Sequence, residues 1–444
     1  MNISVKELET ILGSKAINFN YKREISGFSI DTRTIKNNEV FIPLKGDKTN
    51  GNIFISNAIE KGASLIISEI KLDEYPYIYV EDAMNALKII AIFYLKKIDP
   101  ITIGITGTNG KTTVTDMTAK ITSNYQSTLK TYKNYNNSIG LPLSILKSQG
   151  DDKIFVLEMG ASKIGDINEL INIGTPKIVA LLNVSPAHLK TFGCLDNILS
   201  TKEEIFENQG FVKTVIINRD DKYYNRWLEM NKKNSIRTIS LSNKKADYSI
   251  LGISDHLMSI HTPYEDSFNL TVRNTESYNL RNILFSIALA CEAGARSKHI
   301  VTALDNYDDI QGRSKIYDGI NNSKIIDSSY NANPESFRSS IDYLISLGGS
   351  PWVIMGQMGE LEHQSKQYHA NIAEHAAKRG VEKLFMITDH NDVIKKTFGK
   401  EAYSFNHTDD LIRFIKPLLK KDVHVLIKAS RFMKFETIVD ELTS

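Results

Sequence analysis

Cysteine is nearly absent from this sequence, whose 444 residues include two, Cys194 and Cys291. Two cysteines are too few for a disulfide framework or a cysteine-rich zinc site, and they fit a reducing compartment. Long hydrophobic runs are also absent. The longest, IIAIFYL at residues 89–95, is far shorter than the roughly 18 residues that a membrane span needs. We therefore expect a chain that does not cross a bilayer.

Charge of one sign is lacking too. The 54 basic side chains nearly balance the 52 acidic ones and leave a formal charge of +2, so no overall field favours nucleic acid or an anionic membrane as a partner. The first residues, MNISVKELETILGS, carry acidic side chains where a signal peptide needs an apolar stretch. We expect no targeting segment and a cytoplasmic location.

What the sequence does contain is the alternation of strand-like and helix-like stretches that is typical of α/β proteins. A length of 444 residues, at about 150 residues per domain, predicts two to four domains, and we expect three. Residues 1–83 combine short apolar runs with one helix-like stretch and predict a small α/β domain. Residues 84–312 alternate strands with amphipathic stretches, which predicts a parallel sheet, and residues 238–273 resemble antiparallel hairpins. Residues 313–444 predict a second doubly wound sheet of the Rossmann-like kind.

The most informative stretch is ITIGITGTNGKTT, residues 101–113. An apolar strand is followed by a glycine-rich turn and then by a helix, which directs backbone N–H groups and the positive helix end at one point and so favours a phosphate group. Gly107 and Gly110 permit a close approach, Lys111 supplies a positive charge, and Thr112 offers a hydroxyl to Mg²⁺. Ile105 stands where the strict P-loop pattern has its first glycine, so the match is to the shorter pattern G-x-x-G-K-T.

Three further residues, which lie later in the sequence, extend this predicted site. Glu158 ends an apolar strand, where a parallel sheet opens its ligand crevice, and its carboxylate suits Mg²⁺. His188 follows another strand; a single histidine is more often structural, but this position favours a ligand role. Lys202 lies in a helix-like stretch beside two glutamates, where a solvated helix face is the ordinary interpretation. Phosphate binding alone does not distinguish a kinase, a switch GTPase, a motor and a ligase.

The combination resembles the Mur ligase superfamily, the ATP-dependent amide-forming enzymes of peptidoglycan precursor synthesis. The resemblance covers nearly the whole chain and rests on seven stretches in order: GITGTNGKTT, LEMGAS, NVSPAHL, STKEEIF, YNLRNILFSIALA, QGRSK and IIDSSYNANPESF. The family's ATP loop also lacks the first glycine of the strict pattern, which accounts for Ile105 at that position. Tyr278 stands where the family usually has histidine.

Within the superfamily, four stretches are most similar to the branch that joins UDP-N-acetylmuramoyl-tripeptide to D-alanyl-D-alanine. They are NYNNSIGLPLSIL (134–146), YNANPES (330–336), VIMGQMGELEHQSKQYH (353–369) and VLIKASRFMKFETIV (425–439). Residues 29–54 also resemble that branch's UDP-binding domain. The rivals are a sister ligase that adds another amino acid, a folylpolyglutamate-type ligase and, from a different class, a nucleotide-binding switch without chemistry of its own.

The resemblance implies a role for each matching residue. Lys111 and the backbone of residues 107–113 would bind the ATP phosphates, with Arg313 near the γ-phosphate. Thr112 and Glu158 would hold one Mg²⁺, and His188 and Lys202 a second, with Lys202 carrying a carbamate. The remaining implied contacts are, for ATP, Gly107, Thr108, Asn109, Gly110, Thr113, Asn279, Asn282 and Asp327, and for the substrates, Asp31, Thr32, Arg33, Asn136, Asn137, Tyr330, Asn331 and Asn333. The family precedent is a monomer.

Overall fold

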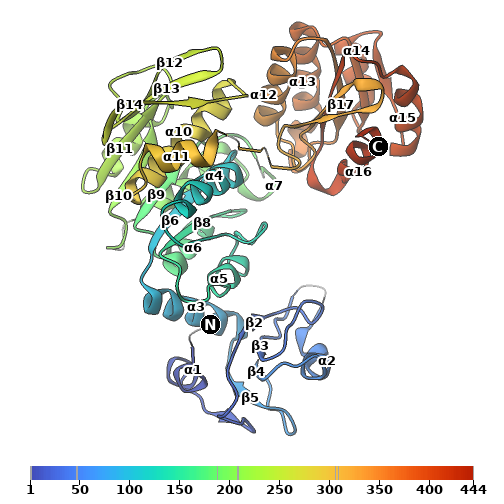
Figure 1. The fold of residues 1–444 in the computed structure, drawn as a ribbon. Helices are drawn as coiled ribbons and strands as arrows, with labels where there is room; N and C mark the ends of the chain where they lie inside the picture. Colours follow the sequence, from blue (N-terminus) through green and yellow to red (C-terminus); the bar gives the residue numbers. More distant parts are fainter. Residues whose placement is uncertain are drawn as a thin grey trace.

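The computed structural model describes residues 3–46, 49–187, 189–207, 210–305, 307–308 and 310–443. These residues form three sheets with helices packed on them, and Figure 1 shows the three parts arranged around a central gap, with the first part at the bottom and the last at the upper right. The predicted α/β class is therefore seen in each part. We propose the ends of residues 1–83, 84–312 and 313–444 as domain limits, because each sheet lies within one of these ranges.

The first part has a five-stranded sheet in the order β1-β5-β4-β3-β2. Its strands are β1 (Ala16–Ile17), β2 (Gly27–Ser29), β3 (Glu39–Phe41), β4 (Leu65–Ser68) and β5 (Tyr77–Tyr79), and its helices are α1 (Val5–Leu12) and α2 (Ile55–Glu60). Helix α3 (Ala83–Ile98) follows β5 and leads into the central part. All neighbouring strands are parallel except β1 and β5. Helix α1 begins at a capping box, in which the Ser4 hydroxyl accepts from the Glu7 N–H and the Glu7 carboxylate accepts from the Ser4 N–H.

The central part has a nine-stranded sheet in the order β14-β13-β12-β11-β10-β9-β6-β8-β7. Its strands are β6 (Ile101–Thr106), β7 (Thr128–Lys130), β8 (Ile154–Glu158), β9 (Ile178–Leu181), β10 (Thr214–Asn218), β11 (Ser235–Ser240), β12 (Tyr248–Ser254), β13 (Leu257–Thr262) and β14 (Glu265–Thr271). Its helices are α4 (Lys111–Ser123), α5 (Gly140–Ile145), α6 (Asp166–Gly174), α7 (Leu189–Phe192), α8 (Leu195–Glu203), α9 (Tyr224–Met230), α10 (Ser277–Glu292) and α11 (Ser297–Leu304).

The predicted hairpins of residues 238–273 are present only in part. Strands β12, β13 and β14 pair antiparallel, whereas β11 pairs parallel with both β10 and β12 and so continues the parallel sheet. A polar stretch, LSNKK at 241–245, separates β11 from β12 and resembled a hairpin turn in the sequence.

The last part has a six-stranded sheet in the order β15-β16-β20-β17-β18-β19, parallel except for β15 against β16. Its strands are β15 (Lys315–Asp318), β16 (Lys324–Asp327), β17 (Ser350–Gly356), β18 (Lys383–Ile387), β19 (Ala402–Ser404) and β20 (Val423–Lys428). Its helices are α12 (Pro334–Ser346), α13 (Ser365–Arg379), α14 (Asn391–Phe398), α15 (Thr408–Ile415) and α16 (Glu436–Thr443).

Burial of both sheet faces explains why these strands are continuously apolar rather than alternating. Along β8, Ile154 and Val156 join the core beneath α4, α10 and α11, while Phe155 and Leu157 join the core on the opposite face. That second core continues through α3 into the sheet of the first part. The last part instead has two cores of its own, one on each face of its sheet.

Candidate active site

The glycine-rich loop lies between β6 and α4, at the carboxyl end of a strand flanked by β9 and β8. Gly107 and Gly110 have φ angles of +154° and +86°, conformations that side chains rarely adopt. A Cβ on Gly110 would lie 2.5 Å from Oδ1 of Asn282. The loop therefore needs glycine both for its backbone path and for its close contact with α10.

Lys111 is the first residue of α4, and its ammonium is folded back over the loop. Its Nζ donates to the carbonyl oxygens of Gly107 at 2.8 Å and Thr108 at 3.0 Å. Burial lowers the pKa of Lys111; the charge of Arg313 lowers it further, and that of Glu158 opposes the shift. A positive charge thus stands at the mouth of the phosphate-binding loop without an ion pair among the described residues.

Thr112 and Glu158 meet beside the loop. The Thr112 hydroxyl donates to Oε2 of Glu158 at 2.8 Å, and the Asn136 side-chain amide donates to Oε1 at 2.7 Å. Glu158 is 3% exposed and has no ion pair among the described residues. A buried carboxylate and a hydroxyl in contact supply the oxygen donors that Mg²⁺ prefers, so these residues fit that ion.

Lys202 lies in α8, and the structure excludes the solvated helix face that its sequence neighbours suggested. Lys202, Glu203 and Glu204 are 4%, 3% and 7% exposed. Glu203 pairs with Arg226 at 2.5 Å and accepts from the Trp227 indole at 2.9 Å. Burial, helped by the charge of Lys111, lowers the pKa of Lys202 to about 7. The amine is therefore unprotonated for a large part of the time near neutral pH.

The linker before β15 connects the last part of the chain to the loop. Arg313 donates from a guanidinium nitrogen to the Thr112 hydroxyl at 2.8 Å, and its guanidinium carbon lies 4.4 Å from the centre of the Tyr330 ring. Asn333 donates to Oδ1 of Asn109 at 2.7 Å, and Asn109 donates to the Glu335 carboxylate at 3.1 Å. Side chains of the last part thus already touch the phosphate-binding loop.

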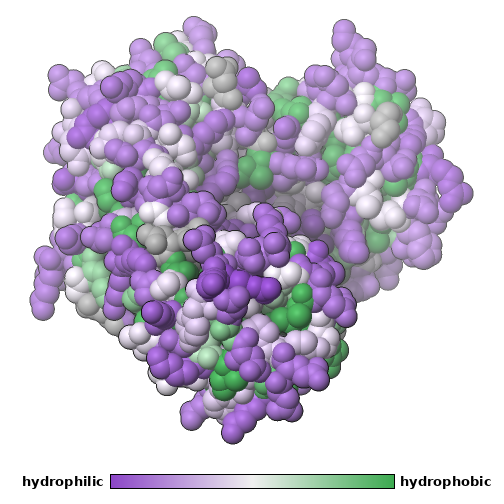
Figure 2. All heavy atoms as spheres, turned by 60° about the horizontal axis from the view of Figure 1, so that its bottom comes forward, coloured by the Kyte–Doolittle hydropathy of each residue, from purple (hydrophilic) through white to green (hydrophobic). Residues whose placement is uncertain are grey.

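These elements enclose a cavity of about 970 Å³. The residues predicted from the sequence that line it are Gly107, Thr108, Asn109, Gly110, Lys111, Thr112, Thr113, Asn136, Asn137, Glu158, Lys202, Asn279, Asn282, Arg313, Tyr330, Asn331 and Asn333. Figure 2 shows one mostly hydrophilic face of the molecule with a hollow between its parts. Segments far apart in the sequence therefore converge, as with Asn109 and Asn333, whose separation is 224 residues.

Two predicted groups lie elsewhere, and one residue is not described. Asp327 is 0% exposed and is not among the cavity residues; its carboxylate accepts from the Gly312 N–H at 2.8 Å and from the Ser329 hydroxyl at 2.6 Å. It holds the linker behind the cavity wall. His188 lies outside the described residues, so its predicted metal role stays a prediction.

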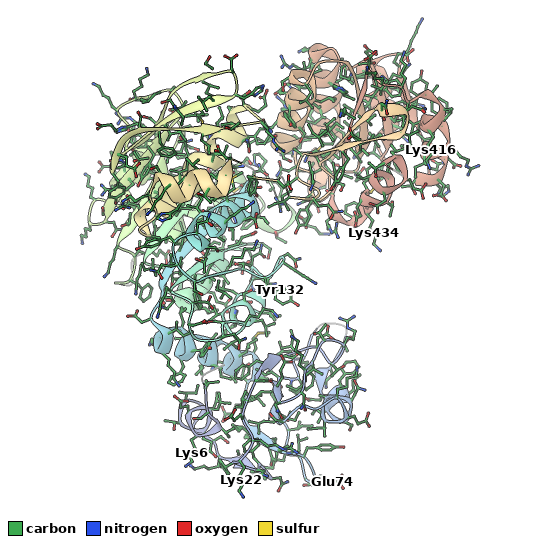
Figure 3. All side chains as sticks on the ribbon, viewed as in Figure 1. Lys6, Lys22, Glu74, Tyr132, Lys416 and Lys434 are labelled. Carbon is green, nitrogen blue, oxygen red and sulfur yellow. The ribbon has the colours of Figure 1, made fainter. Side chains whose placement is uncertain are left out.

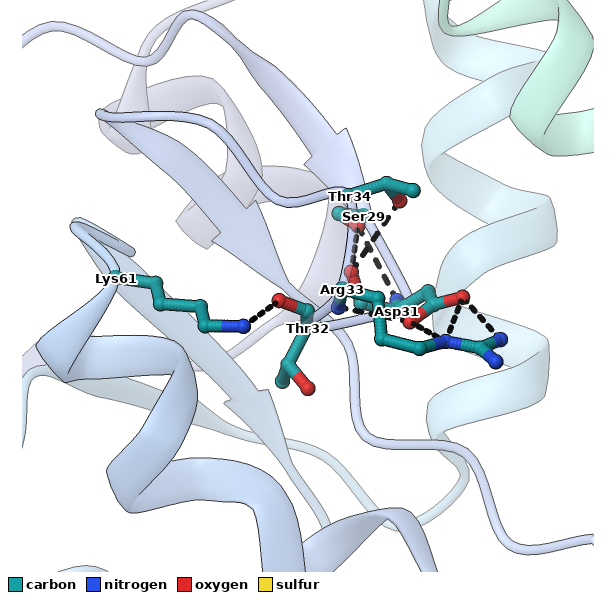
Figure 4. A network of polar contacts seen from close by, with 6 residues as sticks. All are labelled: Ser29, Asp31, Thr32, Arg33, Thr34 and Lys61. Atoms are coloured by element: carbon teal, nitrogen blue, oxygen red, sulfur yellow. Dashed lines mark hydrogen bonds and ion pairs between the residues drawn. The ribbon is translucent and has the colours of Figure 1, made fainter.

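Asp31, Thr32 and Arg33 form a separate polar group in the first part (Figure 4). The Arg33 guanidinium binds both carboxylate oxygens of Asp31, at 2.6 Å for its closest contact, and lowers the pKa of that carboxyl. Lys61 donates to the Thr32 carbonyl at 2.9 Å. Figure 3 places Tyr132, which is 40% exposed, on the side of the central part that faces this domain. The Asp31–Arg33 group is thus distinct from the 970 Å³ cavity.

The charged cavity residues that the sequence analysis did not assign to the site are Asp166, Arg281, Glu335, Glu360, Lys428 and Arg431. Lys428 ends strand β20, and the argument used for Glu158, a charged residue at the carboxyl end of a buried strand, would have found it. Asp166 and Glu335 lie in the first turns of α6 and α12, where acidic residues are common, and carry no such signal.

Comparisons with known proteins identify the family of the chain. Three family models match: Mur ligase family, catalytic domain at residues 24–91; Mur ligase middle domain at 105–290; and Mur ligase, glutamate ligase domain at 312–431. The UDP-N-acetylmuramoyl-tripeptide--D-alanyl-D-alanine ligase of Buchnera aphidicola subsp. Acyrthosiphon pisum is 32% identical over 426 residues, which is 94% of this chain and 93% of the relative. The chain belongs to the MurF type of the Mur ligase family.

Further MurF relatives support the assignment. The Escherichia coli ligase of the same name is 26% identical over 94% of each chain. A crystal structure of MurF from Acinetobacter baumannii has the same fold, with a TM-score of 0.90, 24% identity and coverage of 99% and 98%. MurF from Thermotoga maritima, solved in complex with ADP, has a TM-score of 0.83 and 26% identity over 94% of this chain and 96% of that one. These findings confirm the predicted superfamily, the three-part α/β fold and an ATP-dependent ligase.

Within the described ranges, no helix has both the length and the apolar character that a membrane span requires.

Proposed function

We propose that this MurF-type ligase joins D-alanyl-D-alanine to UDP-N-acetylmuramoyl-tripeptide at the expense of ATP, a step of peptidoglycan precursor synthesis. Eight relatives that carry this name are 26–32% identical over at least 92% of the chain. The observation that carries the proposal is the convergence of the phosphate-binding loop, Glu158, Lys202 and Arg313 on one cavity.

In the first step the tripeptide's terminal carboxylate is activated, since a carboxylate is a poor electrophile at neutral pH. Its oxygen forms a bond to the γ-phosphorus of ATP while the bond from that phosphorus to the β–γ bridging oxygen breaks, and ADP leaves with the electron pair. Lys111 and Arg313 offset the repulsion between the carboxylate and the phosphates.

In the second step the dipeptide amine attacks the acyl phosphate. The C–N bond forms, inorganic phosphate leaves with the C–O electron pair, and the amine proton passes to solvent. Acyl phosphates react readily with water, so closure of the last part over the cavity would protect the intermediate. The contacts of Arg313, Asn333 and Glu335 across this border support such a movement.

We propose two Mg²⁺ ions at this site, one held by Thr112 and Glu158 and one by His188 and Lys202. When bound, Mg²⁺ supplies positive charge that neutralises the phosphate oxygens and orients them for in-line transfer. The hydrogen-bonded Thr112–Glu158 pair supports the first assignment. Among the described residues no cluster of three or more histidine, cysteine or carboxylate side chains forms a metal cage, so most ligands of the ion would come from phosphate oxygens and water.

We also propose a carbamate on Lys202. A free amine adds to CO₂ and releases one proton, which turns a cation into an oxygen ligand. The lowered pKa of Lys202, about 7, supports this because only the unprotonated amine reacts.

Other roles follow from position. We propose that Asp31, Thr32 and Arg33 bind the UDP part of the substrate, that Asn136, Asn137, Tyr330, Asn331 and Asn333 contact the peptide substrates, and that Asn279 and Asn282 contact the adenine side of ATP. We propose that Asp327 acts indirectly at the ribose of ATP, by holding the linker that contains Gly312. We further propose a cytoplasmic monomer.

Phosphate release tests the proposal. Purified protein is given ATP, Mg²⁺ and the UDP-tripeptide, with D-alanyl-D-alanine, with single amino acids or with no acceptor. We expect release to depend on both the tripeptide and the dipeptide. Release with a single amino acid would favour a sister ligase, and release that needs no acceptor would favour a nucleotide switch.

A further inference from the structure

Lys428 is a buried cation for which the reaction as derived so far has no use. It is the last residue of β20, the strand between β16 and β17 in the sheet of the last part. Its side chain is 5% exposed and lines the same cavity as the phosphate-binding loop. Lys428 therefore shares this cavity with Lys111, which is contributed by the central part.

The ammonium of Lys428 has few hydrogen-bond acceptors among the described residues. Among the described residues its one hydrogen-bond acceptor is the Asn331 carbonyl, at 3.1 Å, and it forms no ion pair with a carboxylate. Burial, helped by the charge of Arg313 and opposed by that of Asp327, lowers the pKa of Lys428 to about 7. Burying an ammonium without a counter-charge is costly, so an anion in the cavity would be a strong partner.

The neighbours of Lys428 indicate which anion. Arg313, whose charge acts on Lys428, donates to the Thr112 hydroxyl at the start of α4. The Asn331 carbonyl that accepts from Lys428 belongs to the segment that continues to Asn333, which binds Asn109 of the phosphate-binding loop. The neighbours of Lys428 thus contact the phosphate-binding loop, which is the part of the cavity that favours phosphate groups.

We propose that Lys428 is a catalytic residue that binds the γ-phosphoryl group while it moves from ATP to the tripeptide carboxylate and leaves as phosphate. The inference rests on the proposed function and adds one residue to its mechanism. Lys111 and Lys428 would hold the phosphoryl group from two sides, one contributed by the central part and one by the last part. The bonds made and broken are those given above; Lys428 supplies charge and N–H donors and exchanges no proton.

Nucleotide binding tests this role separately from turnover. In Lys428→Met the side chain keeps a similar length but loses its charge. We expect the affinity for a non-hydrolysable ATP analogue to fall by about 10- to 150-fold, the range for a charge-assisted hydrogen bond, while the affinity for ADP changes by less than about twofold. Lys428→Arg should recover part of the difference.

The control is Lys421→Met, an exposed lysine just before the opposite end of the same strand. It should leave both affinities and the ligation rate unchanged. Equal losses of ADP and analogue affinity in Lys428→Met, or no loss of either, would overturn the proposal, as would a loss confined to the Michaelis constant for the dipeptide. If the wild-type protein fails to ligate the dipeptide at all, the proposed function fails instead.

A measurement on the wild-type protein covers the case in which a variant does not fold. An amine-reactive reagent should label Lys428, and peptide mapping measures the extent. We expect the ATP analogue with Mg²⁺ to protect Lys428 and ADP with Mg²⁺ to leave it reactive. Equal protection by both nucleotides, or by neither, would contradict a contact with the γ-phosphoryl group.

Discussion

At the scale of single residues, the cavity collects three buried or half-buried lysines for which the described residues supply no ion pair. Lys111, Lys202 and Lys428 all line it, and burial lowers the pKa of each. An isolated cation in a protein interior costs free energy, and a triphosphate, a carboxylate or a carbamate removes that cost. The site therefore favours anions although the whole chain is nearly neutral.

Lys111 gives the most direct prediction at this scale. Lys111→Ala removes the charge over the glycine-rich loop and should lower acceptor-dependent phosphate release by at least about 100-fold. The matched control is Lys120→Ala, an exposed lysine of the same helix, which should retain near-normal release. Near-normal turnover in Lys111→Ala would remove this lysine from the mechanism.

Lys202 gives a prediction that separates a carbamate from a simple cation. Lys202→Ala should be nearly inactive and should partly recover when a short carboxylate such as formate or acetate is added, because the added anion supplies the missing oxygen ligands. Ligation rates over a series of carboxylate concentrations measure the effect. Full activity without any addition would make Lys202 an ordinary structural residue.

The buried amine of Lys428 predicts a pH-dependent stability in the absence of ligand. Its folded-state pKa of about 7 lies below the usual 10.5, so between these values the unfolded chain binds more protons and stability rises with pH. Lys428→Met should therefore be more stable than the wild type by about 1–4 kcal/mol at pH 7 and below, and the gap should narrow toward pH 10.5. Urea unfolding from pH 6 to 10 measures it; a gap that does not change with pH would contradict the lowered pKa.

At the scale of elements, α8 and α6 are locked together behind the cavity. Glu204, directly after α8, accepts from the N–H groups of Gly165 at 2.8 Å and Asn168 at 2.9 Å at the start of α6. These groups would otherwise lack partners, because the first N–H groups of a helix have none within it. The same contact fixes α8, which carries Lys202.

Removing this carboxylate should loosen both helices. We expect Glu204→Ala to lower the free energy of unfolding by about 1–3 kcal/mol, because two N–H groups lose their acceptor in a largely buried place. Glu207→Ala is the control: it lies three residues further on and is exposed, so a change within about 0.5 kcal/mol is expected. Equal effects in chemical denaturation would show that the contact contributes nothing specific.

Much at this scale could be predicted from the sequence, because buried parallel strands are continuously apolar and charged residues at their carboxyl ends stand out. The strand ends at Thr106 and Glu158 are examples. The edge strands β1, β2, β15 and β19 were missed because two to four residues carry too little pattern. Long-range pairing was missed as well: no local signal tells that Glu335 meets Asn109 or that Glu203 and Glu204 are buried.

At the scale of the whole molecule, the three parts are joined unequally. One continuous core links the first and central sheets through α3, whereas the last part has separate cores on both faces of its sheet, and of the described residues of the central part only the partly buried Leu189 and Tyr278 pack against one of them. Its described side-chain contacts with the phosphate-binding loop are polar. The last part is therefore the one that can move as a body with the smallest loss of apolar packing.

That arrangement predicts a measurable contraction. Addition of ATP, Mg²⁺ and both substrates should reduce the radius of gyration in small-angle X-ray scattering, because the last part closes over the reacting groups and excludes water. ADP alone is the control and should produce a smaller change. Identical scattering profiles with and without the full set of substrates would count against closure.

The contact between Asn109 and the start of α12 has a consequence for the entropy of assembly. Because Asn333 and Glu335 are hydrogen-bonded to Asn109, closure starts from an arrangement in which the last part already touches the loop. These hydrogen bonds keep the effective concentration of the two parts near each other high, and they meet part of the entropy cost of ordering the two parts for catalysis. To bind the loop, the γ-phosphate of ATP then has to replace only a few hydrogen bonds, such as those of Asn109 with Asn333 and Glu335.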